Sequence, residues 1–229
     1  MNEKRRLTCG LAGVAFLLIT LYYGLIATGP AQYFVAPNAQ KIFYFHVPAG
    51  MITYVAFLIV FSSSAWYLYK ESEYADRLAH SAAELGLLFG AMNLASGTLW
   101  MQVEWGGNIF DRFMTDMRLA TTLAMWLIYV SYVVYRMNSG IDGNKRNAAI
   151  IGVLGAISIP LSYLSSRFLR SDHPVVFASD EGEVDTSMRI GLYLGLCGLL
   201  LIFIYLLDER MMILKKEDEI NRKKMEKQW

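Results

Sequence analysis

The sequence predicts an all-α polytopic membrane protein, a bundle of six transmembrane helices with both termini in the cytoplasm. Of its 229 residues, 55% are apolar and only 18% are charged, whereas soluble domains carry about 25% charged residues. The charges are concentrated between long uncharged runs, and six of these runs approach the roughly 20 residues that a bilayer core of about 30 Å requires. A soluble globular protein is therefore excluded.

The six apolar runs follow one another along the whole chain. The first, residues 7–28, comes after three basic residues and has no small-residue cleavage motif, which favours a retained span over a removed signal peptide. The other spans are expected at 42–69, 82–101, 119–135, 148–164 and 188–207. Residues 1–207 thus form one transmembrane domain. Residues 208–229 alternate basic and acidic side chains, and we expect a charged cytoplasmic tail that continues the last helix.

Lysine and arginine predict the orientation, because basic segments near the ends of spans resist translocation. Of the 21 Lys and Arg residues, 15 lie on the face that carries both termini and the second and fourth loops. The other face, with the first, third and fifth loops, has six. We therefore expect both termini inside and these three loops outside.

Several classes of function are excluded by what the sequence lacks. The net charge is +1 and no basic patch is interleaved with aromatic residues, so nucleic acid is not an expected partner. The two cysteines, Cys9 and Cys197, each stand alone in an apolar run, which rules out a zinc cluster or a covalent haem-attachment box. No phosphate-binding loop of the GxxxxGK[ST] type is present, and no hydrolase or ATPase signature assigns catalytic residues.

The three histidines carry most of the functional information. His46 lies at the outer end of the second span and His173 in the fifth loop, whereas His80 begins the third span on the opposite side. A single histidine near a helix end is commonly a hydrogen-bonded interfacial side chain. Two imidazoles from different segments on one face can instead bind a metal, and can hold a haem iron from both sides. Asp172 is a candidate for orienting an imidazole N–H.

The third loop supplies what a porphyrin would need around such a pair. Its glycines, Gly106 and Gly107, permit close approach of the backbone, and Arg112 or Arg118 can pair with propionates. Flat apolar surface is offered by Trp100, Trp105, Phe110 and Phe113. An interfacial aromatic belt is the alternative explanation for these rings.

Three segments resemble the haem-handling membrane proteins of cytochrome c assembly, specifically the cytochrome c maturation protein C family, also called haem exporter protein C. The segments are KIFYFHVPA at 41–49, SGTLW at 96–100 with WG at 105–106 and DMRLAT at 116–121, and IPLSYLSSR at 159–167 leading to His173. They are similar to the family's first external histidine segment, its tryptophan-rich loop and its second external histidine segment. The sequence departs from the family where tryptophans normally precede the aspartate, here Asp116, and at Phe168 and Leu169.

The resemblance implies a specific function. Non-covalent haem b would be held at the outer, periplasmic face of the cell inner membrane, with His46 and His173 as iron ligands. The aromatic loop would surround it, and Asp116 and Arg118 would serve loop shape and propionate contact. The implied partners are haem, a membrane-anchored haem chaperone (maturation protein E) that receives it, ATP-binding cassette transporter subunits and the lipid bilayer.

Two other functions stay open at this point. One is a b-type cytochrome membrane anchor of an oxidoreductase, which usually places its histidines on facing helices within the bundle. The other is a transporter subunit, in which His46, Glu84 and Glu104 would line a substrate or proton path, because ionisable groups in or near spans are functional candidates.

Overall fold

The computed structural model describes residues 2–31, 35–138, 145–173 and 186–227, and every regular element in these ranges is helical. The all-α prediction is therefore confirmed. A π-helical turn, Tyr23–Ala27, extends the first helix, and a 3-10 turn, Ala39–Ile42, leads into the second. The α-helices are α1 (Glu3–Tyr22), α2 (Phe43–Lys70), α3 (Glu73–Glu104), α4 (Ile109–Thr115), α5 (Met117–Asn138), α6 (Lys145–Gly155), α7 (Ser158–Phe168) and α8 (Thr186–Glu226).

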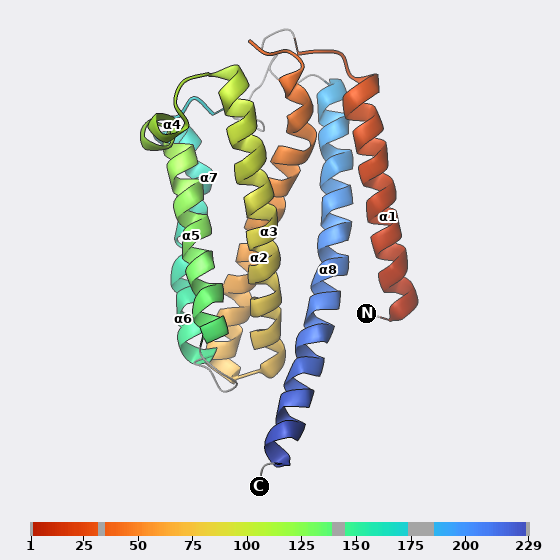
Figure 1. Cartoon of the computed structure of the whole chain (residues 1–229), viewed down its shortest axis with the longest axis vertical. Helices are drawn as coiled ribbons and strands as arrows, with labels where there is room; N and C mark the ends of the chain where they lie inside the picture. Colours follow the sequence, from red (N-terminus) through yellow and green to blue (C-terminus); the bar gives the residue numbers. More distant parts are fainter. Residues whose placement is uncertain (1, 32–34, 139–144, 174–185, 228–229) are drawn as a thin grey trace.

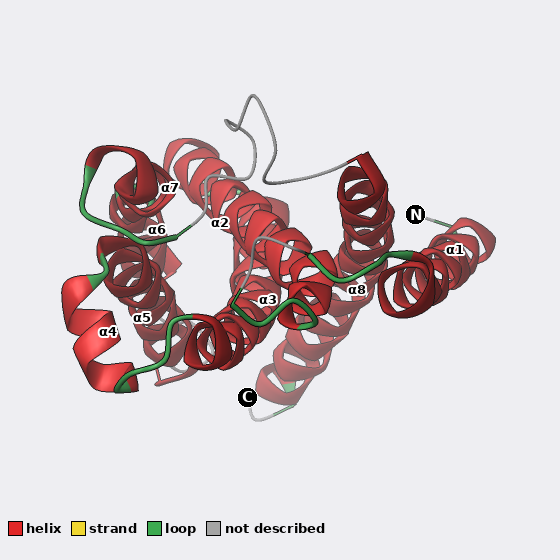
Figure 2. Cartoon of the chain, turned by 90° about the horizontal axis from the view of Figure 1, so that it is seen from above, coloured by secondary structure: helices red, strands yellow, loops and turns green. Residues whose placement is uncertain are grey.

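The long helices run side by side, with α4 and the end of α7 at one end of the bundle and both chain termini toward the other (Figure 1). Helix α2 packs against α3, α6 and α8, and α5 packs against α7, while α1 lies at the edge against α8. Seen from above, α4 lies across the end of the bundle beside α5 (Figure 2). Helix α8 continues beyond the bundle as far as Glu226 (Figure 1).

Within the described residues, five helical segments are long and apolar enough to cross a membrane. They correspond to the first, second, fourth, fifth and sixth predicted spans. The third predicted span, 82–101, lies in α3. This helix is long enough but not apolar enough to be counted, because Glu84 and Asn93 interrupt its apolar run. Helix α3 packs on α2, α5, α6 and α8, so much of its surface faces protein, where polar side chains find partners.

The core of the bundle is built on opposite sides of α2. On one side Phe57 stacks on Tyr129 of α5, with ring centroids 3.7 Å apart and planes at 7°. On the other side, Phe89 of α3 and Phe203 of α8 meet edge to face beside Ile52. These two apolar clusters fix α2 between α3, α5 and α8, and so fix the position of the residues at its N-terminal end.

The fifth predicted span is divided into two helices. A turn at Ala156 and Ile157 separates α6 from α7. Pro160 explains the break, because it has no N–H to donate to the carbonyl of Ala156 four residues earlier. That carbonyl accepts instead from the N–H of Ile159, at 3.1 Å.

Charged side chains gather at the end of the bundle that carries the termini. Arg136 of α5 pairs with Asp76 of α3 at 2.6 Å. Arg210 of α8 makes a bidentate pair with Glu84, with an Nη2–Oε1 distance of 2.9 Å, and His80 lies 3.5 Å from the same carboxylate. His80 thus belongs to an ionic cluster far from the N-terminal end of α2, where His46 lies.

Candidate functional site

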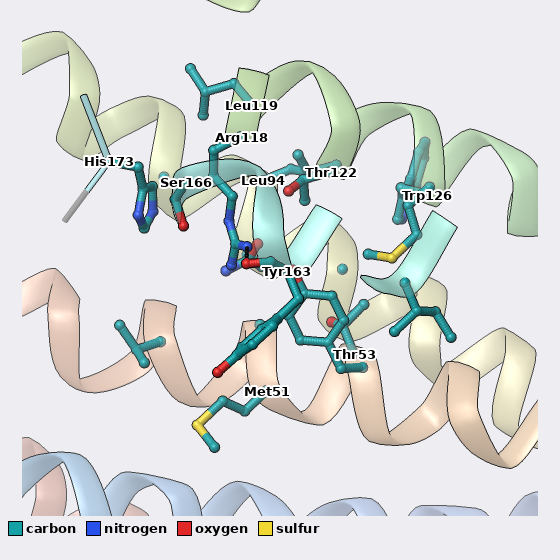
Figure 3. Close-up of a pocket in the computed structure, with 18 of the residues that line it drawn as sticks. Met51, Thr53, Leu94, Arg118, Leu119, Thr122, Trp126, Tyr163, Ser166 and His173 are labelled. Carbon is teal, nitrogen blue, oxygen red and sulfur yellow. Dashed lines mark hydrogen bonds between the residues drawn. The ribbon is translucent and has the colours of Figure 1, made fainter. Parts of the chain in front are cut away.

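A cavity of about 660 Å³ opens inside the half of the bundle that lies away from the chain termini (Figure 3). Its walls come from α2, α3, α5 and α7, together with Phe113 of α4 and His173. Its size falls in the range of small-molecule and cofactor sites. Most of its lining surface is apolar, and its polar groups include His46 and His173.

His46 is held by α3 through one ring nitrogen. Its Nδ1 lies 3.1 Å from the backbone oxygen of Asn93 and 3.1 Å from Oγ of Ser96. A carbonyl only accepts, and the Ser96 hydroxyl already donates to the carbonyl of Met92 at 2.7 Å, so Nδ1 is assigned as the protonated nitrogen. The Asn93 amide lies 3.3 Å from Nδ1 but has a better acceptor in the His46 carbonyl, at 3.0 Å. This tautomer leaves Nε2 with a lone pair for a ligand.

Two glycines allow this close packing of α2 on α3. A Cβ atom at Gly97 would lie 2.8 Å from Cε1 of His46, and one at Gly50 would lie 2.8 Å from Nδ2 of Asn93. Both separations are shorter than real Cβ contacts. The ring of His46 therefore occupies space that only glycine leaves open.

His173 lies in the segment without regular secondary structure that follows α7, and the structure brings its ring to His46. The ring centroids are 6.1 Å apart and the planes differ by 37°. A metal-bound imidazole nitrogen lies about 2 Å from the metal and the ring centroid about 1 Å further, so two rings on opposite sides of one metal have centroids about 6 Å apart. The observed separation fits one metal between the two rings.

Two imidazoles are a ligand set that is compatible with haem iron. Among the described residues, no group of three or more His, Cys, Asp or Glu side chains is placed to hold a metal. Two imidazoles suit an iron that brings its four equatorial nitrogens with it.

Two arginines place positive charge at the cavity. The side chain of Arg118 enters it (Figure 3) and donates through Nη1 to the carbonyls of Ser162 and Tyr163, at 2.6 and 3.1 Å. Arg167, which the sequence reasoning did not single out, also lines the cavity, and its Cζ lies 4.9 Å from the ring centroid of Tyr163. Guanidinium groups pair well with carboxylates such as propionates.

The predicted aromatic residues divide into two groups. Phe113 lines the cavity, whereas Phe110 is 80% exposed and does not. Trp100 and Trp105 meet edge to face at 5.1 Å, outside the cavity lining, and Arg112 donates to the Trp105 carbonyl at 2.9 Å. Contact of these two tryptophans with a ligand stays a prediction.

Asp116 is buried beside the cavity rather than lining it. Its Oδ1 accepts from the N–H groups of Arg118 and Leu119, at 2.9 and 3.1 Å, which caps the start of α5. Its carboxylate also accepts from the segment that carries His173. Asp172 forms an exposed ion pair with Arg112, at 3.0 Å.

Sequence reasoning missed the groups that support His46. At i, i+3 and i+4 of an apolar span stand Asn93, Ser96 and Gly97, so these polar and small residues share one face of the helix. Such a face in an apolar span indicates a surface that points into the protein. The transporter hypothesis grouped His46 with Glu84 and Glu104, but neither glutamate lines the cavity. Glu104 accepts instead from the backbone N–H groups of Val35 and Ala36, both at 2.9 Å.

The chain is similar in sequence to known proteins over most of its length. The family model described as "Heme exporter protein C" matches residues 2–229. Proteins named "Heme exporter protein C" from Bradyrhizobium diazoefficiens and Paracoccus denitrificans are 27% and 26% identical, over 85% and 94% of this chain and 73% and 86% of theirs. A "Cytochrome c biogenesis protein CcsA" of Gossypium barbadense is 26% identical over 71% of this chain and 48% of its own length. The chain therefore belongs to the haem exporter protein C family.

Proposed function

We propose that this chain binds haem b non-covalently between His46 and His173 and presents it to a membrane-anchored haem chaperone. Its family gives it a haem-handling role in cytochrome c biogenesis, in a membrane. The observation that carries the finer proposal is the separation of 6.1 Å between the two imidazole rings at the mouth of one apolar cavity. Haem would supply the iron that both rings would ligate.

The chain's own residues would share the binding. The apolar walls of the cavity suit the porphyrin ring, and Arg118 and Arg167 suit its propionates. The isolated positions of the two cysteines in the sequence support non-covalent binding.

We further propose that α3 is a sixth span, that both termini are cytoplasmic and that the cavity opens toward the periplasmic side of the inner membrane. Helix α3 has 32 residues, enough to cross a bilayer, and it lies along α2. An even number of spans accounts for both termini lying toward one end of the bundle (Figure 1). The excess of Lys and Arg on the terminal face supports its cytoplasmic placement.

Transfer to the chaperone, maturation protein E, beside ATP-binding cassette subunits is supported by the family resemblance. The sequence has no nucleotide-binding loop of its own, so ATP-dependent steps are assigned to those subunits. The b-type cytochrome anchor is less well supported, because His173 lies outside any helix and His80 belongs to the ionic cluster at the opposite end.

The test is a haem titration of the purified protein followed by absorption spectroscopy. We expect His46→Ala and His173→Ala each to convert a six-coordinate low-spin spectrum into one with high-spin character, while His80→Ala leaves it unchanged. Spectra unaffected by both outer substitutions would refute the ligand assignment. Rapid reduction and reoxidation with a quinone, without haem transfer to a partner, would favour the cytochrome anchor instead.

A further inference from the structure

We infer that Ser171 and Asp116 are positioning residues that hold the backbone of His173 against the start of α5. The inference rests on the proposed function, since it concerns how one of the two proposed iron ligands is placed. Neither residue lines the cavity, so both would act through His173 rather than by touching haem.

The carboxylate of Asp116 already accepts as many hydrogen bonds as its two oxygens can take. One carboxylate oxygen accepts from two N–H groups of the first turn of α5, and Ser171 Oγ lies 3.1 and 3.0 Å from the two oxygens. The N–H of Asp172 donates to Oδ2, at 2.8 Å. The side chain of Asp116 is buried, with 4% of the residue exposed. A carboxylate with this many donors is occupied by protein and is not offered to a ligand.

Ser171 connects this carboxylate to the histidine. Its hydroxyl has one hydrogen, which it donates to Asp116, and its oxygen accepts from the N–H of His173 at 3.1 Å. The contacts therefore form a chain from α5 through Asp116 and Ser171 to the backbone of His173. We call these three residues the clasp.

The clasp is needed because this histidine, unlike His46, does not lie in a helix. Residues 170–173 have no regular secondary structure, so their position depends on individual hydrogen bonds. Outside the clasp, the segment is tied to α5 by the N–H of Met117, which donates to the carbonyl of Arg170 at 3.1 Å. The exposed Arg112–Asp172 pair contributes little, as surface ion pairs generally do.

The first arm of the test needs no haem. Hydrogen exchange is measured by mass spectrometry on wild type, Ser171→Ala, Ser171→Thr and Asp116→Asn. Losing one hydrogen bond should speed exchange of peptides covering residues 170–173 by about two- to tenfold. Ser171→Thr keeps the hydroxyl and should retain wild-type exchange. Thr115→Ala, which removes an exposed hydroxyl bonded only within α4, is the control.

The second arm uses ferric haem and absorption spectroscopy. We expect Ser171→Ala and Asp116→Asn to show a high-spin fraction, which added imidazole converts to low spin and which is absent from Ser171→Thr. Asp111→Asn, an exposed aspartate in α4, controls for the loss of charge. Asp116→Asn also weakens the cap of α5, so Ser171→Ala keeps the test valid if that variant does not fold.

Wild-type exchange and a wild-type spectrum in Ser171→Ala would overturn the inference. The two proposals fail differently. If His46→Ala and His173→Ala leave the spectrum unchanged, the proposed function is wrong, and the exchange arm still decides whether the clasp holds the segment. If those two variants lose low-spin haem but Ser171→Ala does not, the clasp alone is wrong.

Discussion

Replacing Gly97 by alanine places a methyl group against the ring of His46. The added Cβ would lie 2.8 Å from Cε1 of that ring, whereas carbon atoms in contact lie about 3.5–4.0 Å apart. The ring must therefore retreat by about 0.7 Å or more. Its hydrogen bonds to Asn93 and Ser96, both 3.1 Å, tolerate only a few tenths of an ångström before they leave the usual range.

The substitution should change the geometry of the site while leaving the overall stability of the protein nearly unchanged. Overpacking costs about 1–3 kcal/mol, while alanine in a helix interior is favoured over glycine by about 1 kcal/mol. We therefore expect a small change in Tm. If the added methyl group displaces the ring of His46, the same cost of about 1–3 kcal/mol is lost from the haem-binding free energy, and haem affinity falls by about 5- to 150-fold.

The assay is a haem titration followed in the Soret band, with thermal unfolding measured on the same samples. Ala95→Val, which adds methyl groups on the exposed side of the same turn, is the matched control and should bind haem as wild type does. Wild-type affinity and spectrum in Gly97→Ala would refute the claim that α3 fixes the ring of His46.

Other substitutions separate the cavity from the rest of the bundle. Asp76→Asn leaves Arg136 without its buried carboxylate partner and should lower the free energy of unfolding, measured with denaturant, by about 3–5 kcal/mol. The haem spectrum of this variant should not change. Wild-type stability would contradict a stabilising role for the ion pair. Phe113→Ala removes cavity lining and should weaken haem binding in a titration, whereas Phe110→Ala, at an exposed ring, should not; equal effects of the two would contradict the described cavity.

Much of the fold follows from apolar run length, because a lipid environment requires helices of a given length. The break between α6 and α7 was signalled by Pro160 but not predicted. Helix α4, with Asn108 accepting from the N–H of Phe110 at 2.8 Å, was read as loop because a helix of seven residues gives no periodicity to detect.

The candidate site was predictable in part. Sequence order and the alternation of spans placed His46 and His173 on one face, and the structure brings their rings together. The burial of Asp116 was not predictable, because it depends on the approach of residues 170–173, which are distant in sequence. The sequence also did not indicate that Arg167 lines the cavity. Its place there depends on how α7 is oriented after the turn at Ala156.

The most direct test of the account is to identify the iron's axial ligands in the haem-loaded protein. Electron–nuclear double resonance on ferric protein labelled with 15N-histidine should detect two histidine nitrogens coupled to one low-spin iron. The coupling of one nitrogen should disappear in His46→Ala and that of the other in His173→Ala. A single histidine coupling, or two that persist in either variant, would contradict it.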